Sequence, residues 1–235
     1  MMTRLCWSLI ALLLPLAAAA QIPAPQPFAI VYEARSGGSQ IGITESRLTA
    51  LGGGRYEYRN VTEAAGLLSL LSSERIVETS RFDWHAGRAR PEFYSRLRSS
   101  GKGRPVEQRF DWPRTEVLAR HGGEEKRYAA TPGLQDRMSV LLSVSAALAA
   151  QQPPGTHAVA GDNEAQRHRF EDQGEEKLAT PLGELPTRRV ARYKDDASQP
   201  SLRLWLAPSL GWLPVRLEKD DDGKAILLEA VSITR

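Results

Sequence analysis

The chain has 235 residues, 41% of them hydrophobic and 25% charged, and its formal net charge is +3 at pH 7. A hydrophobic fraction of this size allows a sizeable core. A mildly basic balance does not by itself indicate nucleic-acid binding, so we expect no nucleic-acid partner. The single cysteine, Cys6, excludes a framework of intramolecular disulfides.

Residues 1–20 have the features of a secretory signal peptide. Arg4 supplies the positive charge, residues 5–16 form the apolar segment, and three alanines fit a cleavage site before Gln21. A membrane anchor is the alternative, but the apolar run is short and ends in alanines and then prolines. Cys6 lies inside the apolar segment and not at the cleavage point, so we expect no lipid anchor. We therefore predict a periplasmic protein without a thiol or a transmembrane span, whose net charge is +2 after Arg4 is lost.

Residues 21–27, QIPAPQP, are predicted to form a Pro-rich N-terminal tether, and residues 28–235 a single β-rich domain. Short runs of alternating polarity between Gly, Pro and Asp turns predict antiparallel strands. One apolar segment, residues 64–71, is ambiguous between a short helix and a loop. The predicted strands are residues 28–34, 41–49, 55–62, 75–84, 88–98, 107–112, 116–120, 126–129, 157–159, 167–172, 176–180, 185–193, 202–207, 212–219 and 226–234.

Residues 134–149, LQDRMSVLLSVSAALA, have the pattern of a long helix. Two starts are open: Thr131 as the cap with Pro132 in the first turn, or Asp136 as the cap with Ser139 three residues on. Sixteen residues span about 24 Å, which is shorter than the hydrocarbon core of a bilayer. The apolar stripe consists of Leu134, Met138, Leu141 and Leu148, widened by Leu142 and Val144.

These elements together predict a mainly β fold. Roughly a dozen strands with turns every 8–12 residues or so are typical of a large antiparallel sheet that curls. Because such a sheet twists, one of its faces becomes concave. We therefore predict a single half-barrel or open barrel, with the one long helix packed in or over its concave face.

No motif for catalysis or metal binding stands out. The four histidines lack the spacing of a zinc site, and no G-x-S-x-G nucleophile motif is present. The acids that would serve a hydrolase acting on cell-wall polymers are Asp83, Asp111 and Asp136. We predict a protein that is not an enzyme and that uses no metal and no cofactor, and we keep the cell-wall hydrolase as the least favoured alternative.

The mature chain has four tryptophans, which are spread over separate strand segments. They either fill the core between sheet and helix or line an apolar cavity for a lipophilic ligand, and both readings are open. The candidate cavity residues are Trp84, Trp112, Trp205 and Trp212 from the strands and Met138, Leu141 and Leu142 from the helix.

Residues 75–114 carry ten Lys or Arg against five Asp or Glu, a local charge of +5. In an exported protein such a surface suits anionic headgroups, cell-wall polymers or an envelope protein. The alternative is that these arginines occupy the solvated faces of strands. The candidate interaction surface consists of Arg88, Arg90, Arg96 and Arg98.

Several short motifs follow one another along the chain. They are residues 28–32 (FAIVY), 80–82 (SRF), 91–94 (PEFY), 110–112 (FDW), 136–139 (DRMS), 180–183 (TPLG), 205–207 (WLA) and 214–216 (PVR). Their order resembles the proteobacterial exported family known as domain of unknown function 3108, over residues 28–234. The resemblance implies an exported, β-rich domain and no particular reaction. A curled sheet with a helix in its mouth is also similar to the half-barrel lipoprotein carriers of the Gram-negative periplasm.

We consider two functions. The first is a non-enzymatic periplasmic protein that binds a lipid or a lipoprotein acyl chain in envelope maintenance, with the helix as plug or lid. The second is a structural or interaction module with a filled core, which docks on an envelope protein through sheet edges or through the Arg-rich segment 88–104. An apolar void of about 300 Å³ or more favours the first function, and native-density packing favours the second. The oligomeric state is not encoded in any pattern that we recognise.

Overall fold

The computed structural model describes residues 22–66, 69, 73–101, 103–221 and 224–235. The predicted signal peptide lies outside these residues, as do residues 67, 68, 70 and 71 of the ambiguous segment. Within the part of the chain that is described, no helix is long and apolar enough to cross a membrane.

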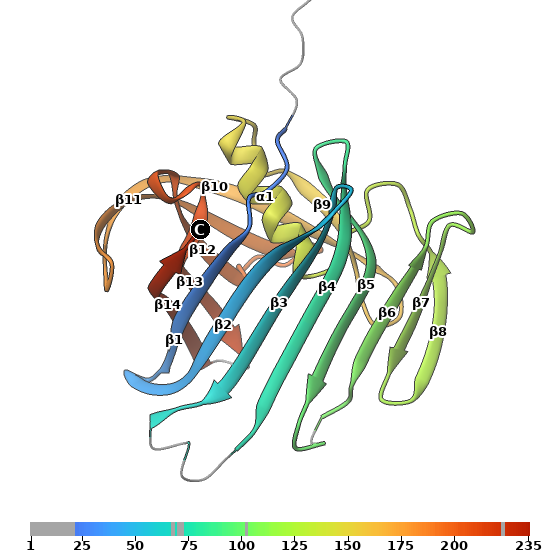
Figure 1. Ribbon diagram of the computed structural model, residues 1–235, viewed down its shortest axis with the longest axis horizontal. Coiled ribbons are helices and arrows are strands. Elements are labelled where there is room, and N and C mark those ends of the chain that lie inside the picture. Colours follow the sequence, from blue (N-terminus) through green and yellow to red (C-terminus); the bar gives the residue numbers. More distant parts are fainter. Residues whose placement is uncertain (1–21, 67–68, 70–72, 102, 222–223) are drawn as a thin grey trace, which may run out of the picture.

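Fourteen antiparallel strands form one open, curled sheet, and the helix α1 lies against its concave face (Figure 1). The predicted fold is therefore confirmed. The elements are β1 (Phe28–Ser36), β2 (Ser39–Gly52), β3 (Arg55–Ala64), β4 (Arg75–His85), β5 (Arg88–Arg98), β6 (Val106–Asp111), β7 (Glu116–His121), β8 (Glu124–Ala129), α1 (Ser139–Ala149), β9 (Thr156–Ala160), β10 (Ala165–Thr180), β11 (Gly183–Lys194), β12 (Leu202–Ala207), the 3₁₀ helix η2 (Pro208–Leu210), β13 (Leu213–Asp221) and β14 (Lys224–Thr234).

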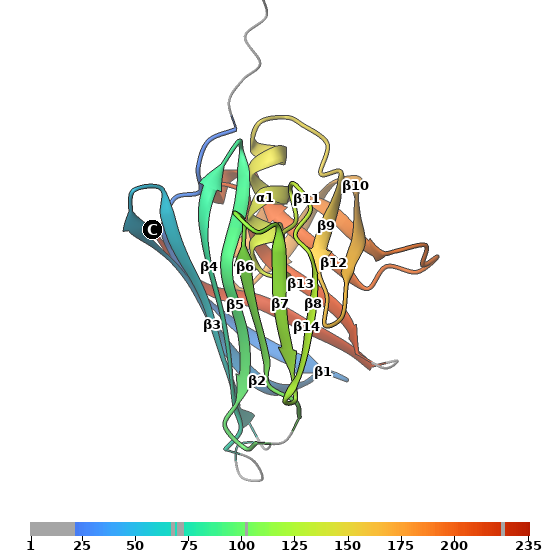
Figure 2. The same ribbon diagram turned by 90° about the vertical axis from the view of Figure 1, so that its right-hand side faces the viewer.

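The helix belongs to the segment that links the two edge strands of the sheet. From edge to edge the order is β8-β7-β6-β5-β4-β3-β2-β1-β14-β13-β12-β11-β10-β9, so the first and last strands are neighbours in the middle of the sheet. Strands β8 and β9 are consecutive in the chain but form the two opposite edges. The segment between them, which contains α1, must therefore travel from one edge to the other, and Figure 2 shows α1 between the two arms of the curled sheet.

Side chains join the two edges of the sheet at one end. The hydroxyl of Tyr128 in β8 and the amide of Gln108 in β6 both donate hydrogen bonds to the carbonyl oxygen of Gly161, each at 2.8 Å. Beside them, His121 Nδ1 lies 3.0 Å from a carboxylate oxygen of Asp162. The barrel is thus closed locally by side chains, although β8 and β9 share no ladder of backbone hydrogen bonds.

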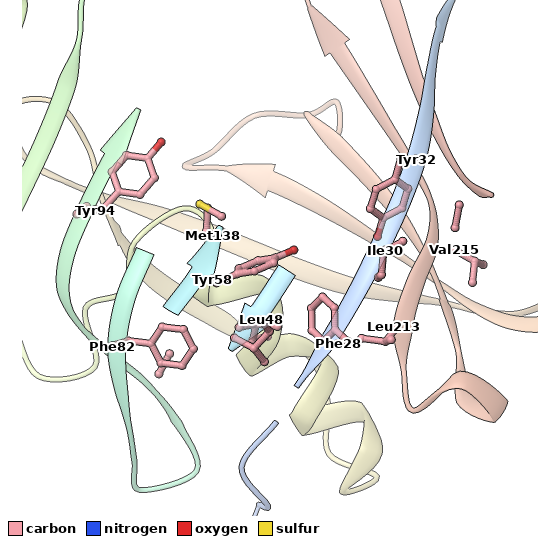
Figure 3. Close-up of a cluster of buried hydrophobic side chains, with 14 of the residues drawn as sticks. Phe28, Ile30, Tyr32, Leu48, Tyr58, Phe82, Tyr94, Met138, Leu213 and Val215 are labelled. Carbon is pink, nitrogen blue, oxygen red and sulfur yellow. The ribbon is translucent and has the colours of Figure 1, made fainter. Parts of the chain in front are cut away.

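The concave face of the central strands is built by alternation. In β1 every second residue is buried, with Phe28, Ile30 and Tyr32 pointing inward. The neighbouring strands continue this surface with Leu48 and Tyr58 (Figure 3). Burying side chains of this size contributes roughly 1.5–3 kcal/mol each to folding, so this surface is the main hydrophobic core.

Strand β10 replaces two predicted strands. Residues 167–172 and 176–180 belong to one strand, whose pairing with β11 shifts between Asp172 and Glu175. Gly174, at the irregularity, has a φ of +90°, which favours glycine. A bulge of this kind interrupts the alternation of polarity without ending the strand, and this explains why the sequence pattern suggested a turn.

Helix α1 begins at Ser139, five residues after the predicted start, and ends at the predicted Ala149. The earlier residues are not helical because Gln135 pairs in parallel with Val159 of β9. Its N–H donates to the carbonyl oxygen of Ala158 at 2.9 Å, and its carbonyl accepts from the N–H of Ala160 at 2.8 Å. The prediction of helix over residues 134–138 is therefore wrong, because a tertiary β-bridge takes the backbone groups of Gln135 that a helix would use.

The helix is buried on two sides and fills the half-barrel as a plug. Val140, Val144 and Leu148 pack against β9–β12, in a cluster that includes Val190 and Leu204. Met138 and Leu142 belong instead to the core formed with β1–β5, and Figure 3 shows Met138 between Tyr58 and Tyr94. The buried surface is therefore wider than the predicted stripe: it includes Ser139, Ser143, Ala146 and Ala147.

Candidate functional site

A cavity of about 340 Å³ lies between the start of α1 and the concave face of the sheet. Met138 and Leu141 border it from the helix. One wall comes from β3–β5 and the other from β9–β14, and we call this space the interior cavity. Its volume falls within the range of about 300–1,000 Å³ that is usual for ligand sites.

The β11–β14 wall of the interior cavity carries two rows of different chemistry. Residues that face each other across paired strands form a row, and the next row on the same face lies about 7 Å away. The apolar row, which is nearer to the helix, consists of Val190, Leu204, Leu217 and Leu228. The neighbouring row, which we call the cationic row, consists of Arg192, Leu202, Lys219 and Ile226.

The opposite wall has the same two-part arrangement. Tyr58, Ser80 and Tyr94 form the row nearer to the helix, and Asn60, Glu78 and Arg96 form the next one. The hydroxyl of Tyr94 donates a hydrogen bond of 2.6 Å to Glu78. Burial raises the pKa of Tyr58 to about 12, so its hydroxyl stays neutral. Each wall thus changes from neutral to charged with distance from the helix.

Positive charge dominates the lining of the interior cavity. Five cationic side chains line it, Arg96, Arg137, Arg192, Lys194 and Lys219, and its lining contains one carboxylate, Glu78. Burial, and then the nearby Arg137, lowers the pKa of Arg192 to about 10. Partial desolvation, and then Arg192 and Arg137, lowers the pKa of Lys194. Arg192 therefore remains charged at neutral pH, and the effect of Arg137 on both groups shows that these cations repel one another.

Three of these cations lack a polar partner. Across the described part of the chain, the side chains of Arg96, Arg137 and Lys194 form no ion pair or hydrogen bond; Arg137 lies over the ring of Tyr94, 5.7 Å from its centroid. Arg192 donates a hydrogen bond to the hydroxyl of Ser201, at 3.2 Å. Elsewhere arginines are commonly paired, as in Arg81–Glu57 and Arg203–Glu218. The cavity therefore holds three cations, Arg96, Arg137 and Lys194, for which the described residues supply no hydrogen-bond acceptor.

His168 adds a buried imidazole to this wall. It is 3% exposed, and neither ring nitrogen has a hydrogen-bond partner in the described structure. Its Cα pairs with that of Lys194 across β10 and β11. Burial, followed by the charges of Arg192 and Lys194, lowers the pKa of His168 to about 3. The ring is neutral at physiological pH and offers one donor and one acceptor to a ligand.

Asp136 fixes the start of α1 above the cavity. Its Oδ1 accepts the N–H groups of Met138 and Ser139 at 2.8 and 2.9 Å, and its Oδ2 accepts the hydroxyl of Ser80 at 2.6 Å. This is the second of the two predicted caps. Burial raises the pKa of Asp136, although the hydrogen bonds from Ser80, Ser139 and Met138 oppose that effect. The carboxyl ties the helix to β4 and so holds Arg137 and Met138 in place.

The seven predicted cavity residues do not share one site. Met138 and Leu141 line the interior cavity. Leu142 is buried beside a separate groove of about 210 Å³, formed between α1 and tether residues 23–26. Trp84 lies close to the same tether, because its Nε1 is 3.4 Å from the carbonyl oxygen of Ile22.

None of the other three tryptophans lines the interior cavity. Trp205 is buried, donates to Glu176 at 3.1 Å and lies on the opposite face of β12 from Leu204. Trp212 borders the tether groove. Trp112 donates to the carbonyl oxygen of Pro91 at 2.7 Å and lines a groove of about 510 Å³ at the rim.

The four predicted interaction arginines are divided between two places. Arg88 and Arg90 line the rim groove beside Trp112, and Asp83 holds Arg90 through two hydrogen bonds of 3.0 and 2.7 Å. Arg96 faces the interior cavity, and Arg98 pairs with Glu74 at 3.1 Å. The structure thus does not bring the four residues together on one surface, and docking through residues 88–104 stays a prediction.

The three acids considered for a hydrolase are also dispersed. Asp83 and Asp111 form ion pairs with Arg90 and Arg114, and Asp136 is buried as the helix cap. Among the described residues, no three or more His, Cys, Asp or Glu side chains lie together so that they could hold a metal ion.

Reasoning from the sequence missed Arg137, Arg192, Lys194 and His168. A usable signal was present for two of them. Strand alternation puts Arg192 and Lys194 on the same face as Val190, whose apolar side chain marks that face as inward. A cation at an inward position is unusual and indicates a functional interior. Arg137 gave no such signal, because its position depends on the break in helical structure before Ser139.

Comparisons with known proteins address the family and the fold. The family model described as "protein of unknown function (DUF3108)" matches residues 31–228. No curated protein matches the chain. A β-barrel-like protein of the domain of unknown function DUF1849 from Brucella abortus aligns with a TM-score of 0.54 at 10% identity, over 88% of this chain and 96% of that one.

Two further solved structures align with lower scores. A Bacteroides fragilis protein described as exported, with a YmcC-like fold, has a TM-score of 0.36 at 11% identity, over 93% of this chain and 100% of that one. A Parabacteroides distasonis protein described as a lipoprotein has a TM-score of 0.35 at 8% identity, over 90% of this chain and 97% of that one. The Brucella abortus protein supports the fold alone. Because the family model spans nearly the whole β-rich domain, the chain belongs to the DUF3108 family of proteins of unknown function, as the order of its motifs predicted.

Proposed function

We propose that this protein is a non-enzymatic binding protein of the cell envelope that takes an amphiphilic ligand, such as a lipid or a lipoprotein acyl chain, into its interior cavity. The features typical of a signal peptide in residues 1–20 support an envelope location. Helix α1 acts as a fixed plug, against which the apolar part of the ligand packs.

The two-row wall is the observation that carries this proposal. Leu217 and Leu228 border the interior cavity next to Leu141 of the helix, and the cationic row follows about 7 Å further along the same strands. A purely apolar cavity, one of the two alternatives left open by the sequence, would suit a neutral hydrocarbon. A cavity that changes from apolar to cationic suits a molecule with a hydrocarbon part and a negatively charged end.

Co-purification tests the proposal. The mature protein, purified from the periplasm of a bacterial host, is analysed by native mass spectrometry, and the released ligand is identified after denaturation. We expect a bound lipid and displacement of a hydrophobic fluorescent dye by added lipid. If no lipid co-purifies and no such dye binds, the proposal is wrong.

A pair of matched variants locates the site. Leu228→Trp adds bulk to a half-buried position in the wall of the interior cavity. Leu97→Trp makes the same change at a position that is 52% exposed. We expect Leu228→Trp to reduce lipid binding strongly while Leu97→Trp leaves it unchanged. Equal binding by the two variants would place the ligand outside the interior cavity and contradict the proposal.

A further inference from the structure

We propose that the charged end of the ligand is a phosphate monoester, held by Arg137, Arg192 and Lys194 with His168 beside it. This inference rests on the proposed function, because it concerns the same cavity, and it specifies the chemical class of the ligand. We call these four residues the phosphate cluster.

The four residues come from different parts of the chain but meet at one end of the cavity. Arg192 and Lys194 are two residues apart in β11 and share one face of the sheet. His168 lies directly opposite Lys194 in the neighbouring strand β10. Arg137 approaches from the segment before α1 and lines the same cavity. A ligand group at this end is thus surrounded from the sheet and from the helix side.

The lining of the interior cavity carries five cationic side chains against one carboxylate, that of Glu78, which also accepts the hydroxyl of Tyr94 at 2.6 Å. Burial lowers the pKa of Arg137, but Tyr94, Glu78, Asp162 and Asp136 together raise it. Asp136, which precedes Arg137, uses both oxygens for hydrogen bonds with Ser80 and backbone N–H groups. Cations placed together in a partly desolvated site cost folding free energy unless an anion joins them. The unused donors of Arg137 and Lys194 indicate that this anion comes from outside the chain.

Charge and geometry favour a phosphate monoester over a carboxylate. A phosphate monoester carries a charge between about −1.5 and −2 at pH 7 and has three strong acceptor oxygens, whereas a carboxylate carries −1 and has two. The planar guanidinium groups of Arg137 and Arg192 can each bind a phosphate through two parallel hydrogen bonds, and Lys194 adds a point charge. Neutral His168 adds one N–H donor without further repulsion. Three cations and this donor match the phosphate oxygens better than those of a carboxylate.

The apolar row determines where the rest of the molecule lies. Leu202 sits between Arg192 and Lys219 in the cationic row, and Leu217 and Leu228 follow in the apolar row. A hydrocarbon chain attached to the phosphate would extend from the cluster along these leucines towards Leu141. We therefore assign a single-chain phosphate monoester, with its phosphate at the cluster, as the ligand class.

Four probes separate the headgroup from the chain in isothermal titration calorimetry with the full mature protein, below the critical micelle concentration of each lipid. Oleoyl lysophosphatidic acid has both parts, oleate has the same chain with a carboxylate, monoolein has the chain with a neutral headgroup, and inorganic phosphate has no chain. We expect lysophosphatidic acid to bind at least about tenfold more tightly than oleate, with monoolein and inorganic phosphate weaker still.

The possible results distinguish this inference from the proposed function. If oleate or monoolein binds as tightly as lysophosphatidic acid, the phosphate assignment is wrong and lipid binding stands. If inorganic phosphate binds as tightly as lysophosphatidic acid while monoolein does not bind, the cluster serves free phosphate and the proposed lipid function is wrong. If none of the four probes binds, both are wrong.

Variants test the residues directly. Arg192→Gln, Arg137→Gln and Lys194→Gln should each weaken lysophosphatidic acid binding by about tenfold and leave monoolein binding unchanged. Arg203→Gln is the control, because Arg203 lies on the face of β12 opposite to Leu202, which lines the cavity, and pairs with Glu218 at 2.6 Å. Lys194 is exposed at the end of β11, so Lys194→Gln is not expected to impair folding. If the Lys194→Gln and Arg192→Gln variants both fold and both bind lysophosphatidic acid with unchanged affinity, the assignment is wrong.

Discussion

Replacing Asp136 with alanine should destabilise the protein by about 2–4 kcal/mol. The carboxyl accepts three hydrogen bonds, from the N–H groups of Met138 and Ser139 and from the hydroxyl of Ser80, and all of these groups are buried. Loss of a helix cap costs about 1 kcal/mol, and each buried donor left without a partner costs roughly 1–3 kcal/mol. The alanine variant no longer buries a negative charge, and the desolvation free energy that is saved offsets part of this sum.

Asp136→Asn separates the hydrogen bonds from the charge. The asparagine oxygen can still accept both backbone N–H groups, and its amide can donate to the hydroxyl of Ser80. Burial raises the pKa of Asp136 above its value in the unfolded chain. Its titration therefore favours folding at acidic pH, and this contribution is lost as the pH rises through the folded pKa. We expect Asp136→Asn to be at least as stable as the wild type at pH 7, with an advantage that shrinks as the pH falls.

Urea denaturation followed by circular dichroism measures both variants, at pH 7 and at pH 4.5. Asp111→Ala is the matched control, since Asp111 also accepts a backbone N–H, that of Arg114 at 3.0 Å, but its side chain is 40% exposed at the end of β6. This change should alter stability by less than about 1 kcal/mol. The reasoning fails if Asp136→Ala is as stable as this control, or if Asp136→Asn loses as much stability as Asp136→Ala.

Three further changes test other parts of the structure. Gly42→Ala should destabilise the protein by about 1–3 kcal/mol, because the new Cβ would lie 2.8 Å from the carbonyl oxygen of Glu63. The control is Ser39→Ala, a change at an exposed position of the same strand. Equal midpoints of thermal unfolding for the two variants would refute this prediction. Tyr94→Phe removes the 2.6 Å hydrogen bond to Glu78 and should cost about 1.5 kcal/mol in urea denaturation, whereas an unchanged midpoint would show that the bond contributes nothing. The pKa of His168 is lowered to about 3, below its unfolded value, so its contribution to stability is present above about pH 6.5 and is lost as the pH falls towards 3. A His168→Gln variant should therefore lose less stability than the wild type between pH 6.5 and 4, and parallel curves would contradict this assignment.

The candidate site was only partly predictable. Periodicity put Met138 and Leu141 on the helix face that meets the cavity. The prediction that the tryptophans line one cavity was not useful, because their side chains pack in separate places. Trp205 lies on the face of β12 opposite to Leu204, and Trp112 lines the rim groove. Four cavity cations, Arg137, Arg192, Lys194 and Lys219, were not singled out from the sequence, because lysine and arginine are rarely found inside proteins. Only the register of β10–β14 shows that His168, Arg192 and Lys194 meet.

The sequence by itself determined the features that depend on neighbouring residues. Alternation of polarity and the glycine-containing turns located the strands to within a few residues, because side-chain direction in a strand follows a period of two. The same local rules located the end of the helix at Ala149.

Only the tertiary structure decided which distant segments meet. Nothing local makes β1 pair with β14, or sends the chain from edge strand β8 across the concave face to edge strand β9. The start of α1 was also decided by a distant segment, because the bridge between Gln135 and Val159 replaced helical hydrogen bonds. The interior cavity therefore exists only in the folded chain, because its two walls and its positive charge are assembled from segments that share no local pattern.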